Sequence, residues 1–155
     1  MGKRRITCTL IGWVAAAALA ISLAPANPAT AAEIARPSNP GGTGAAATLT
    51  GNAEAGAKVF AANCMPCHGA DAKGGIPNPG SADGTVPPLN PIDPTIANKD
   101  PKIFAHNVDL FVQNGSTPEG HHPAIRMPAW GADKMLTQQQ IADVIAYIIR
   151  LNTSR

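Results

Sequence analysis

The sequence predicts an all-α domain of about a hundred residues, with three or more helices joined by long loops. Three segments carry apolar residues at helical spacing, and no run of residues alternates as a strand would. Beyond residue 32 the aromatic residues are Phe60, Phe104, Phe111, Trp130 and Tyr147. Because small cores stabilise a fold only marginally, a domain this poor in aromatic residues needs a further centre for its core.

The first helix is expected to begin with Asn52 as its N-cap and Glu54 in its first turn, and to run as far as Cys64. Gly56 is unusual inside this helix, because a helical glycine costs about 1 kcal/mol relative to alanine. Its presence predicts that another backbone crosses the helix closely at this point.

The motif that follows, Cys64-Met65-Pro66-Cys67-His68, is the attachment pattern of a c-type haem. Each thiol adds to one vinyl group of the porphyrin, and His68 reaches the iron as the first axial ligand. A redox dithiol would need a βαβ frame, and a zinc site would need a second Cys/His pair at ligand spacing; the sequence has neither. One covalent haem c is therefore the predicted cofactor and the predicted centre of the core.

The rest of the chain predicts a long loop and two more helices. Residues 69–98 are rich in Gly, Pro, Asn and Asp, which favour turns wrapped over the cofactor. The middle helix is expected between Asp100 as N-cap and Gly115 as its stop. The last helix begins with a capping box formed by Thr137 and Gln140. Its apolar stripe consists of Ile141, Val144, Ile145, Ile148 and Leu151.

The second axial ligand has several candidates: Met65, Met127, Met135, His106, His121 and His122. Met65 lies inside the attachment loop, and Met135 directly precedes the last helix, where an apolar staple explains it. Met127 lies in an irregular segment and is followed by a proline. The adjacent His121 and His122 could reach the iron instead and would give a centre of lower potential, although exposed loop histidines are commoner.

Over about residues 52–151 the arrangement resembles the class I monohaem cytochromes c. The matching features are Gly56 and Phe60 ahead of the motif, Pro87-Pro88-Leu89 after it, the Met-Pro segment and a closing helix with Tyr147. The resemblance implies that the first and last helices cross at Gly56 and that Met127 is the second axial ligand.

The resemblance also implies contacts around the haem. The carbonyl of Pro87, or else that of Pro88, is expected to accept a hydrogen bond from His68 Nδ1 and so orient the imidazole. Leu89 belongs to the same loop and is expected near the haem. Trp130 either packs at the haem edge, binds a propionate or fills the core.

The residues before the domain predict that the protein is exported from the cytoplasm. Residues 1–32 have a positive start, an apolar stretch from Leu10 to Ala20 and a small-residue cleavage pattern, as signal peptides do. If it is not cleaved, the segment from Ile6 to Ala24 is almost long enough to anchor the chain in a membrane, which takes roughly 20 residues. Residues 33–51 predict a disordered Pro/Gly/Ala-rich linker, and residues 52–155 the haem domain.

Charge and ligation together predict the function. The chain has twelve Lys and Arg residues against ten Asp and Glu, and removing the three basic residues of the signal leaves nine against ten. No basic stripe supports nucleic-acid binding. We expect a periplasmic or otherwise extracytoplasmic one-electron carrier, not an enzyme, which meets redox proteins through an exposed haem edge. The alternatives are a haem subunit of a dehydrogenase or oxidase complex and a ligand-binding haem sensor or peroxidase.

Overall fold

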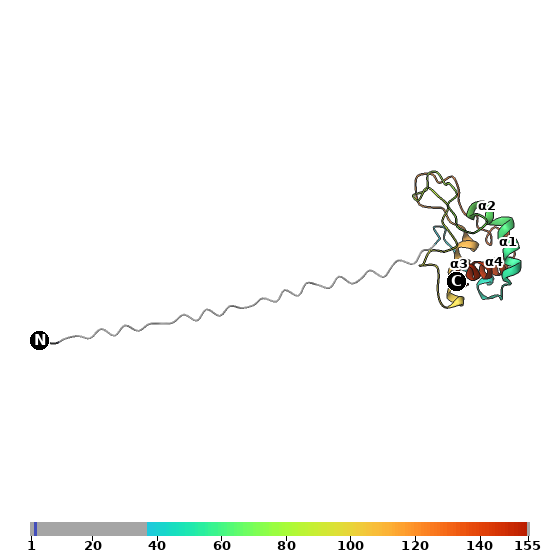
Figure 1. The fold of residues 1–155 in the computed structure, drawn as a ribbon, viewed down its shortest axis with the longest axis horizontal. Helices are drawn as coiled ribbons and strands as arrows, with labels where there is room; N and C mark the ends of the chain where they lie inside the picture. The colour runs from blue at the N-terminus through green and yellow to red at the C-terminus, as the bar shows by residue number, and fades with distance from the viewer. Residues whose placement is uncertain (1, 3–36, 155) are drawn as a thin grey trace. The chain divides into compact units, whose positions relative to one another are not determined.

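A computed structural model of the chain describes residue 2 and residues 37–154. The predicted signal peptide, apart from residue 2, lies outside the described residues. The described domain is helical, as expected, and its β-pairing is limited to isolated bridges. No helix among these residues is long and apolar enough to cross a membrane. The helices are a short 3-10 helix η1 (Ala45–Thr48) and the α-helices α1 (Ala53–Asn63), α2 (Met65–His68), α3 (Pro101–Asn114) and α4 (Gln138–Thr153) (Figure 1).

The helices begin where their capping residues predict. Asn52 accepts two backbone N–H bonds of 2.9 Å at the start of α1. Asp100 accepts one of 2.8 Å at the start of α3. Thr137 and Gln140 form the complete capping box of α4. Gly115 ends α3 in a left-handed conformation, with φ of 66°, which glycine adopts without steric cost. These local predictions are confirmed.

The crossing predicted from Gly56 is also confirmed, and α4 is the helix that crosses α1. A Cβ atom on Gly56 would lie 1.9 Å from the carbonyl oxygen of Asp143. One turn further along each helix, the rings of Phe60 and Tyr147 pack with centroids 5.3 Å apart and a tilt of 53°. The absence of a side chain at residue 56 therefore lets the two backbones touch.

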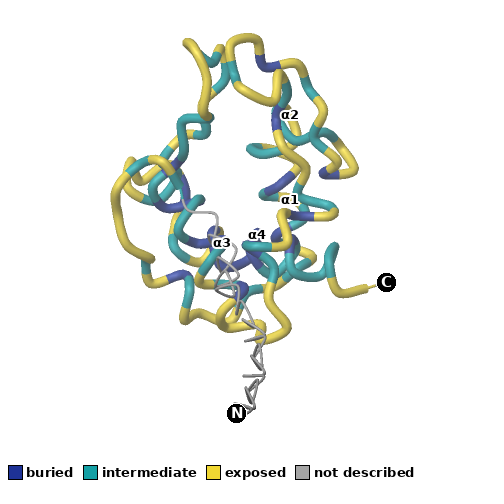
Figure 2. The backbone as a smooth tube through the Cα atoms, turned by 90° about the vertical axis from the view of Figure 1, so that its left-hand side faces the viewer, coloured by how far each residue is buried: buried dark blue, intermediate teal, exposed yellow. Residues whose placement is uncertain are grey.

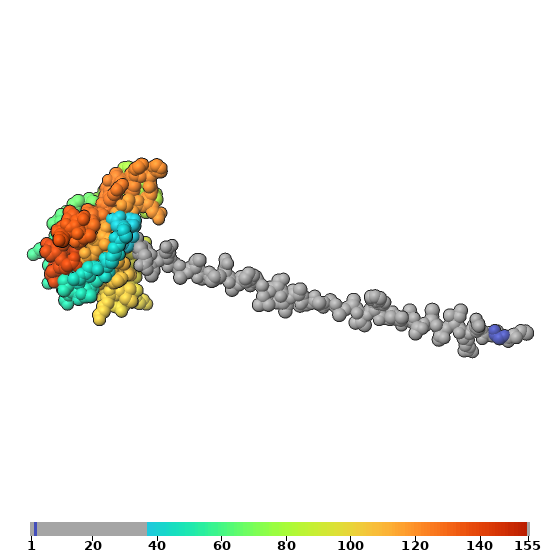
Figure 3. Space-filling view, turned by 180° about the vertical axis from the view of Figure 1, so that it is seen from behind, coloured from blue at the N-terminus to red at the C-terminus, as the bar shows by residue number. Residues whose placement is uncertain are grey.

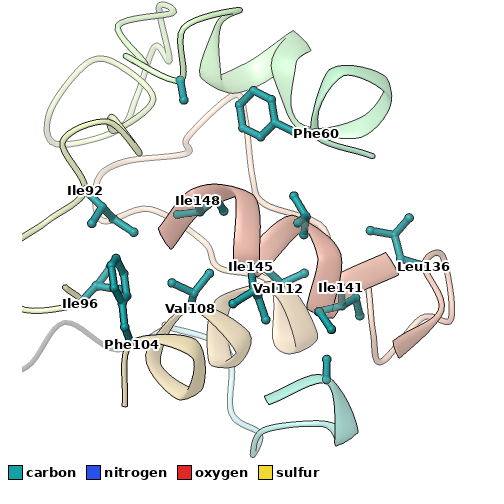
Figure 4. Packing of buried hydrophobic residues seen from close by; sticks show 14 residues of the cluster. Phe60, Ile92, Ile96, Phe104, Val108, Val112, Leu136, Ile141, Ile145 and Ile148 are labelled. Atoms are coloured by element: carbon teal, nitrogen blue, oxygen red, sulfur yellow. The ribbon is translucent and has the colours of Figure 1, made fainter. Parts of the chain in front are cut away.

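The hydrophobic core lies on both sides of α4 (Figure 4). Ile141, Ile145 and Ile148 are at most 3% exposed, and this stripe packs toward Val108 and Val112 of α3. The buried residues of the helices lie mainly on α3 and α4, whereas the long connecting loops are largely exposed or half-buried (Figure 2). The helices thus supply most of the core, and the long loops connect them at the surface.

The expected disordered linker differs from the structure over the residues that the structure describes, 37–51. Part of this segment forms η1, in which Ala46 is 2% exposed and belongs to the core cluster. The backbone amide of Gly44 donates to Asp109 Oδ2 at 2.7 Å, and that of Ala46 donates to Gln138 Oε1 at 3.0 Å. The segment has little apolar bulk, but its backbone donors find acceptors on α3 and α4, and these bonds hold it against the domain.

The expected apolar staple before α4 also needs a correction. Met135 is 54% exposed, whereas the next residue, Leu136, is 7% exposed. Leu136 directly precedes the N-cap Thr137, and this is the position from which a staple packs back onto the first turn of the helix. Met135 lies one residue too early in the chain for that role.

We predict that Gly56→Ala destabilises the holoprotein by about 2 kcal/mol, although alanine favours helices. The added methyl group would meet the Asp143 carbonyl, so α1 and α4 must move apart. Chemical denaturation measures this loss, with Lys58→Ala on the exposed face of α1 as the control. The control should stay within about 0.5 kcal/mol of the unsubstituted protein. Equal unfolding midpoints for the two variants would show that the crossing tolerates a side chain.

Candidate haem site

The four residues predicted to hold the haem line one cavity of about 380 Å³. Cys64 lies at the junction of α1 and α2, Cys67 and His68 lie in α2, and Met127 lies in the connection between α3 and α4. The walls are mainly apolar, and they include Leu89, Ile96, Phe111, Trp130 and Ile148. Pro87 and the Leu89 and Trp130 side chains, expected near the haem, therefore all border this cavity.

The cysteine motif is bonded to the last turn of α1. The amide of Cys64 donates to the carbonyl of Phe60 at 2.8 Å, and the amide of His68 donates to the carbonyl of Cys64 at 2.9 Å. Pro66 occupies the first turn of α2, where its missing N–H leaves no bond unmade. Since residues three apart share one face of a helix, Cys64 and Cys67 face the cavity together.

His68 is oriented by the loop that returns over it. Its Nδ1 lies 3.1 Å from the carbonyl oxygen of Pro87. A carbonyl only accepts, so Nδ1 carries the proton and Nε2 presents a free lone pair. Burial lowers the pKa of His68, and the Pro87 bond opposes this only in part. The imidazole is therefore neutral at neutral pH, in the form that binds a metal.

The thiol of Cys64 is in an unreactive setting. Burial, together with the nearby Cys67, raises its pKa to about 11. A redox dithiol depends on a lowered pKa, because the thiolate is the attacking species. The environment of Cys64 therefore does not suit dithiol exchange.

Met127 is held by pairing with the residues that follow α3. Its amide donates to the Ser116 carbonyl at 2.9 Å, and the Ser116 amide donates to the Met127 carbonyl at 3.1 Å. Gly115 lies so close that a Cβ atom there would be 2.4 Å from the Met127 carbonyl oxygen. The backbone of the methionine is thus fixed to the C-terminal end of α3.

Asn78 joins the two loops of the site and was not anticipated from the sequence. It is 1% exposed, and its side-chain amide donates to the Ile125 carbonyl at 3.0 Å. Its Oδ1 accepts the Ile125 amide at 2.7 Å. The loop after the cysteine motif is thereby tied to the segment that ends in Met127. Nothing in Pro77-Asn78-Pro79-Gly80 distinguishes this asparagine from an ordinary turn residue.

The other ligand candidates lie away from the cavity lining. His121 and His122 are exposed, and their rings contact each other with centroids 5.1 Å apart. Met65 is 39% exposed and His106 is an exposed residue of α3. Arg126 is a further charged residue that lines the cavity.

The donors and walls of this cavity fit a covalently bound haem. Two thiols can form the thioethers, and a neutral imidazole and a thioether sulfur are axial ligands used by haem iron. The cavity lies within the roughly 300–1,000 Å³ of sites that bury a small molecule or cofactor. Its mainly apolar lining suits a porphyrin.

Comparison with known proteins agrees with this chemistry. Residues 53–152 match the family model described as Cytochrome c. The chain is 30% identical over 98 residues to the Cbb3-type cytochrome c oxidase subunit CcoP of Cereibacter sphaeroides. The alignment covers 63% of this chain and 30% of that relative, so the chain spans less than a third of the relative's length. The comparison with solved structures returned no significant match.

We predict that Asn78→Asp destabilises the holoprotein by about 2 to 3 kcal/mol at neutral pH. The introduced carboxylate can still accept from the Ile125 amide, but it has no proton to donate to the Ile125 carbonyl. Protonation at low pH restores a donor, so the difference from the unsubstituted protein should narrow as pH falls.

Denaturation at several pH values tests this, with Asn98→Asp as the matched control. Asn98 is exposed and uses only its acceptor oxygen, toward the Asp100 amide at 2.9 Å, which the substitution keeps. A loss of stability at position 98 as large as that at position 78 would contradict the role given to Asn78.

Proposed function

Since the chain belongs to the cytochrome c family, we propose that it carries single electrons on one haem c, attached to Cys64 and Cys67 and ligated by His68 and Met127. The observation that carries this proposal is that all four side chains line the same apolar cavity. When bound, haem c supplies an iron that exchanges one electron between its ferrous and ferric states.

The chain's own residues set the properties of that site. Pro87 holds His68 in the tautomer that offers Nε2 to a metal. Met127 contributes a neutral, soft sulfur, which favours the reduced iron and raises the potential relative to a second histidine. The apolar walls exclude water and leave few dipoles to reorganise when the charge changes.

The proposed ligand pair also decides between carrier and catalyst. His68 and Met127 would fill both axial positions, so no open position remains for a substrate. Electrons must then pass through the exposed porphyrin edge to a redox protein that docks at the mouth of the cavity. Carriers of this kind use small, transient interfaces. We place the protein outside the cytoplasm, with membrane contact only if the N-terminal segment is retained.

A second candidate function is a haem subunit held in a dehydrogenase or oxidase complex. The similarity to an oxidase subunit favours it. The two functions differ in whether the chain works alone, and we expect that the haem protein in native extracts elutes at the size of a monomer. Size-exclusion chromatography of the native membrane and soluble extracts measures this. If all the haem protein co-migrates with one large complex, the chain is a subunit of that complex and not a free electron carrier.

We predict that Met127→Ala removes the weak near-red Met-to-iron absorption band of the oxidised protein. The reduced variant should bind carbon monoxide, because one axial position is open. Its reduction potential should fall measurably, because the choice of axial ligand varies the potential of haem iron over roughly 0.8 V. Absorption spectra recorded during a redox titration measure all three effects.

Met135→Ala is the matched control, because Met135 is 54% exposed and does not line the cavity. It should leave the band and the potential unchanged. An unsubstituted protein that is high-spin, or that binds carbon monoxide rapidly, would exclude Met127 as ligand and favour the sensor or peroxidase class.

A further inference from the structure

Residues 38–46, here called the N-terminal strap, lie along the C-terminal half of α3. Figure 3 shows the first residues of the described domain, in cyan, against the orange residues at and beyond the end of α3. At the inner end of the strap, the amides of Gly44 and Ala46 donate to Asp109 and Gln138. Ala46 enters the core beside them. The strap is therefore anchored on two helices.

Asp109, which accepts the Gly44 amide, and its neighbour Gln113 on α3 are themselves buried. Asp109 is 0% exposed and Gln113 is 6% exposed. Gln113 Nε2 donates to Asp109 Oδ1 at 3.1 Å and to Gln138 Oε1 at 2.8 Å. Without the strap, Asp109 would lose the Gly44 amide, its shorter bond. A buried polar group is costly without a partner, and the Gly44 amide supplies that partner to the Asp109 carboxylate.

The outer end of the strap reaches the segment that holds Met127. Asn39 Nδ2 donates to the Asn114 carbonyl at 2.9 Å, and Asn114 Nδ2 donates to the Gly42 carbonyl at 3.0 Å. Ser38 Oγ accepts the amide of Thr117 at 2.6 Å. The same hydroxyl lies 3.2 Å from Ser116 Oγ. The strap thus bonds to both residues that directly follow Gly115.

Ser116 is the backbone partner of Met127 in both directions, at 2.9 and 3.1 Å. The contacts therefore run without a gap from Ser38 through Ser116 to Met127. We infer that the strap is a positioning device for Met127, in which Ser38 holds Ser116 so that the methionine stays directed at the cavity. This inference rests on the proposed function, because it concerns the strength with which Met127 holds the iron.

The test replaces the hydroxyl of Ser38 in the full-length holoprotein. In Ser38→Ala the Thr117 amide and the Ser116 hydroxyl lose one partner. Imidazole is then titrated into the oxidised protein, and displacement of the methionine is followed by the near-red Met-to-iron band. We expect imidazole to bind about fivefold more tightly, which corresponds to the loss of one ordinary hydrogen bond. Hydrogen exchange of the Ser116 and Met127 amides should be faster by a similar factor.

Two further variants separate this effect from a general loosening. Ser38→Thr keeps the hydroxyl and should restore the unsubstituted imidazole affinity. Thr48→Ala removes a 2.9 Å hydrogen bond from the Thr48 hydroxyl to the Ala45 carbonyl. This bond lies within η1 and does not involve the Met127 segment. The variant should leave both readouts unchanged.

The outcomes distinguish this inference from the function beneath it. If the unsubstituted protein lacks the Met-to-iron band, the proposed ligation is wrong and the inference falls with it. If the band is present but Ser38→Ala matches the unsubstituted protein in imidazole affinity and amide exchange, only the inference is overturned. An equal gain in imidazole affinity in Thr48→Ala would also overturn it.

Discussion

The contact between the backbones of α1 and α4 determines the geometry of the rest of the domain. Gly56 allows α1 to lie against the Asp143 carbonyl, and this sets the direction in which α1 runs. The cysteine motif begins where α1 ends, and the bond from the Cys64 amide to the Phe60 carbonyl joins it to the last turn of that helix. The other side of the cavity includes Ile148 of α4. One close approach therefore relates the helix that leads into the motif to the helix that supplies Ile148 to the same cavity.

Asparagine side chains fix the long loops in place by hydrogen-bonding the backbone of distant segments, as neighbouring strands bond each other in a sheet. A carboxamide carries a donor and an acceptor, so it can bond an N–H and a C=O of a passing backbone as a neighbouring strand would. Asn78 does this at Ile125, and Asn152 donates to the Leu89 carbonyl and accepts the Ile92 amide, each at 2.9 Å. Through Asn152 the loop that carries Pro87 is fixed to α4. These clamps maintain the relative positions of the His68 and Met127 sides of the cavity in a domain whose described part has no extended strand.

The helices and the haem motif could be predicted because their signals are local. Asn52, Asp100 and Thr137 cap helices through atoms two or three residues away, and Gly56 stands out against the propensity of its own helix. The pairing of Met127 with Ser116 and the clamp made by Asn78 could not be predicted in this way. Each depends on a partner that is distant in the chain, and no periodic pattern points from one to the other.

The contacts of the strap were not expected from the sequence for a related reason, because they depend on the surface that receives it. Its composition is that of a disordered segment, with too little apolar bulk to offset the entropy of ordering. Burial raises the pKa of Asp109, because desolvation penalises the charged carboxylate, and the bonds from Gln113 and the Gly44 amide oppose that shift. Its position beside Val108 on the buried side of α3 was the available signal. An acid on the apolar face of a helix needs a hydrogen-bond donor from outside that helix. Here the donor is the Gly44 amide of the strap, a segment whose composition predicts disorder.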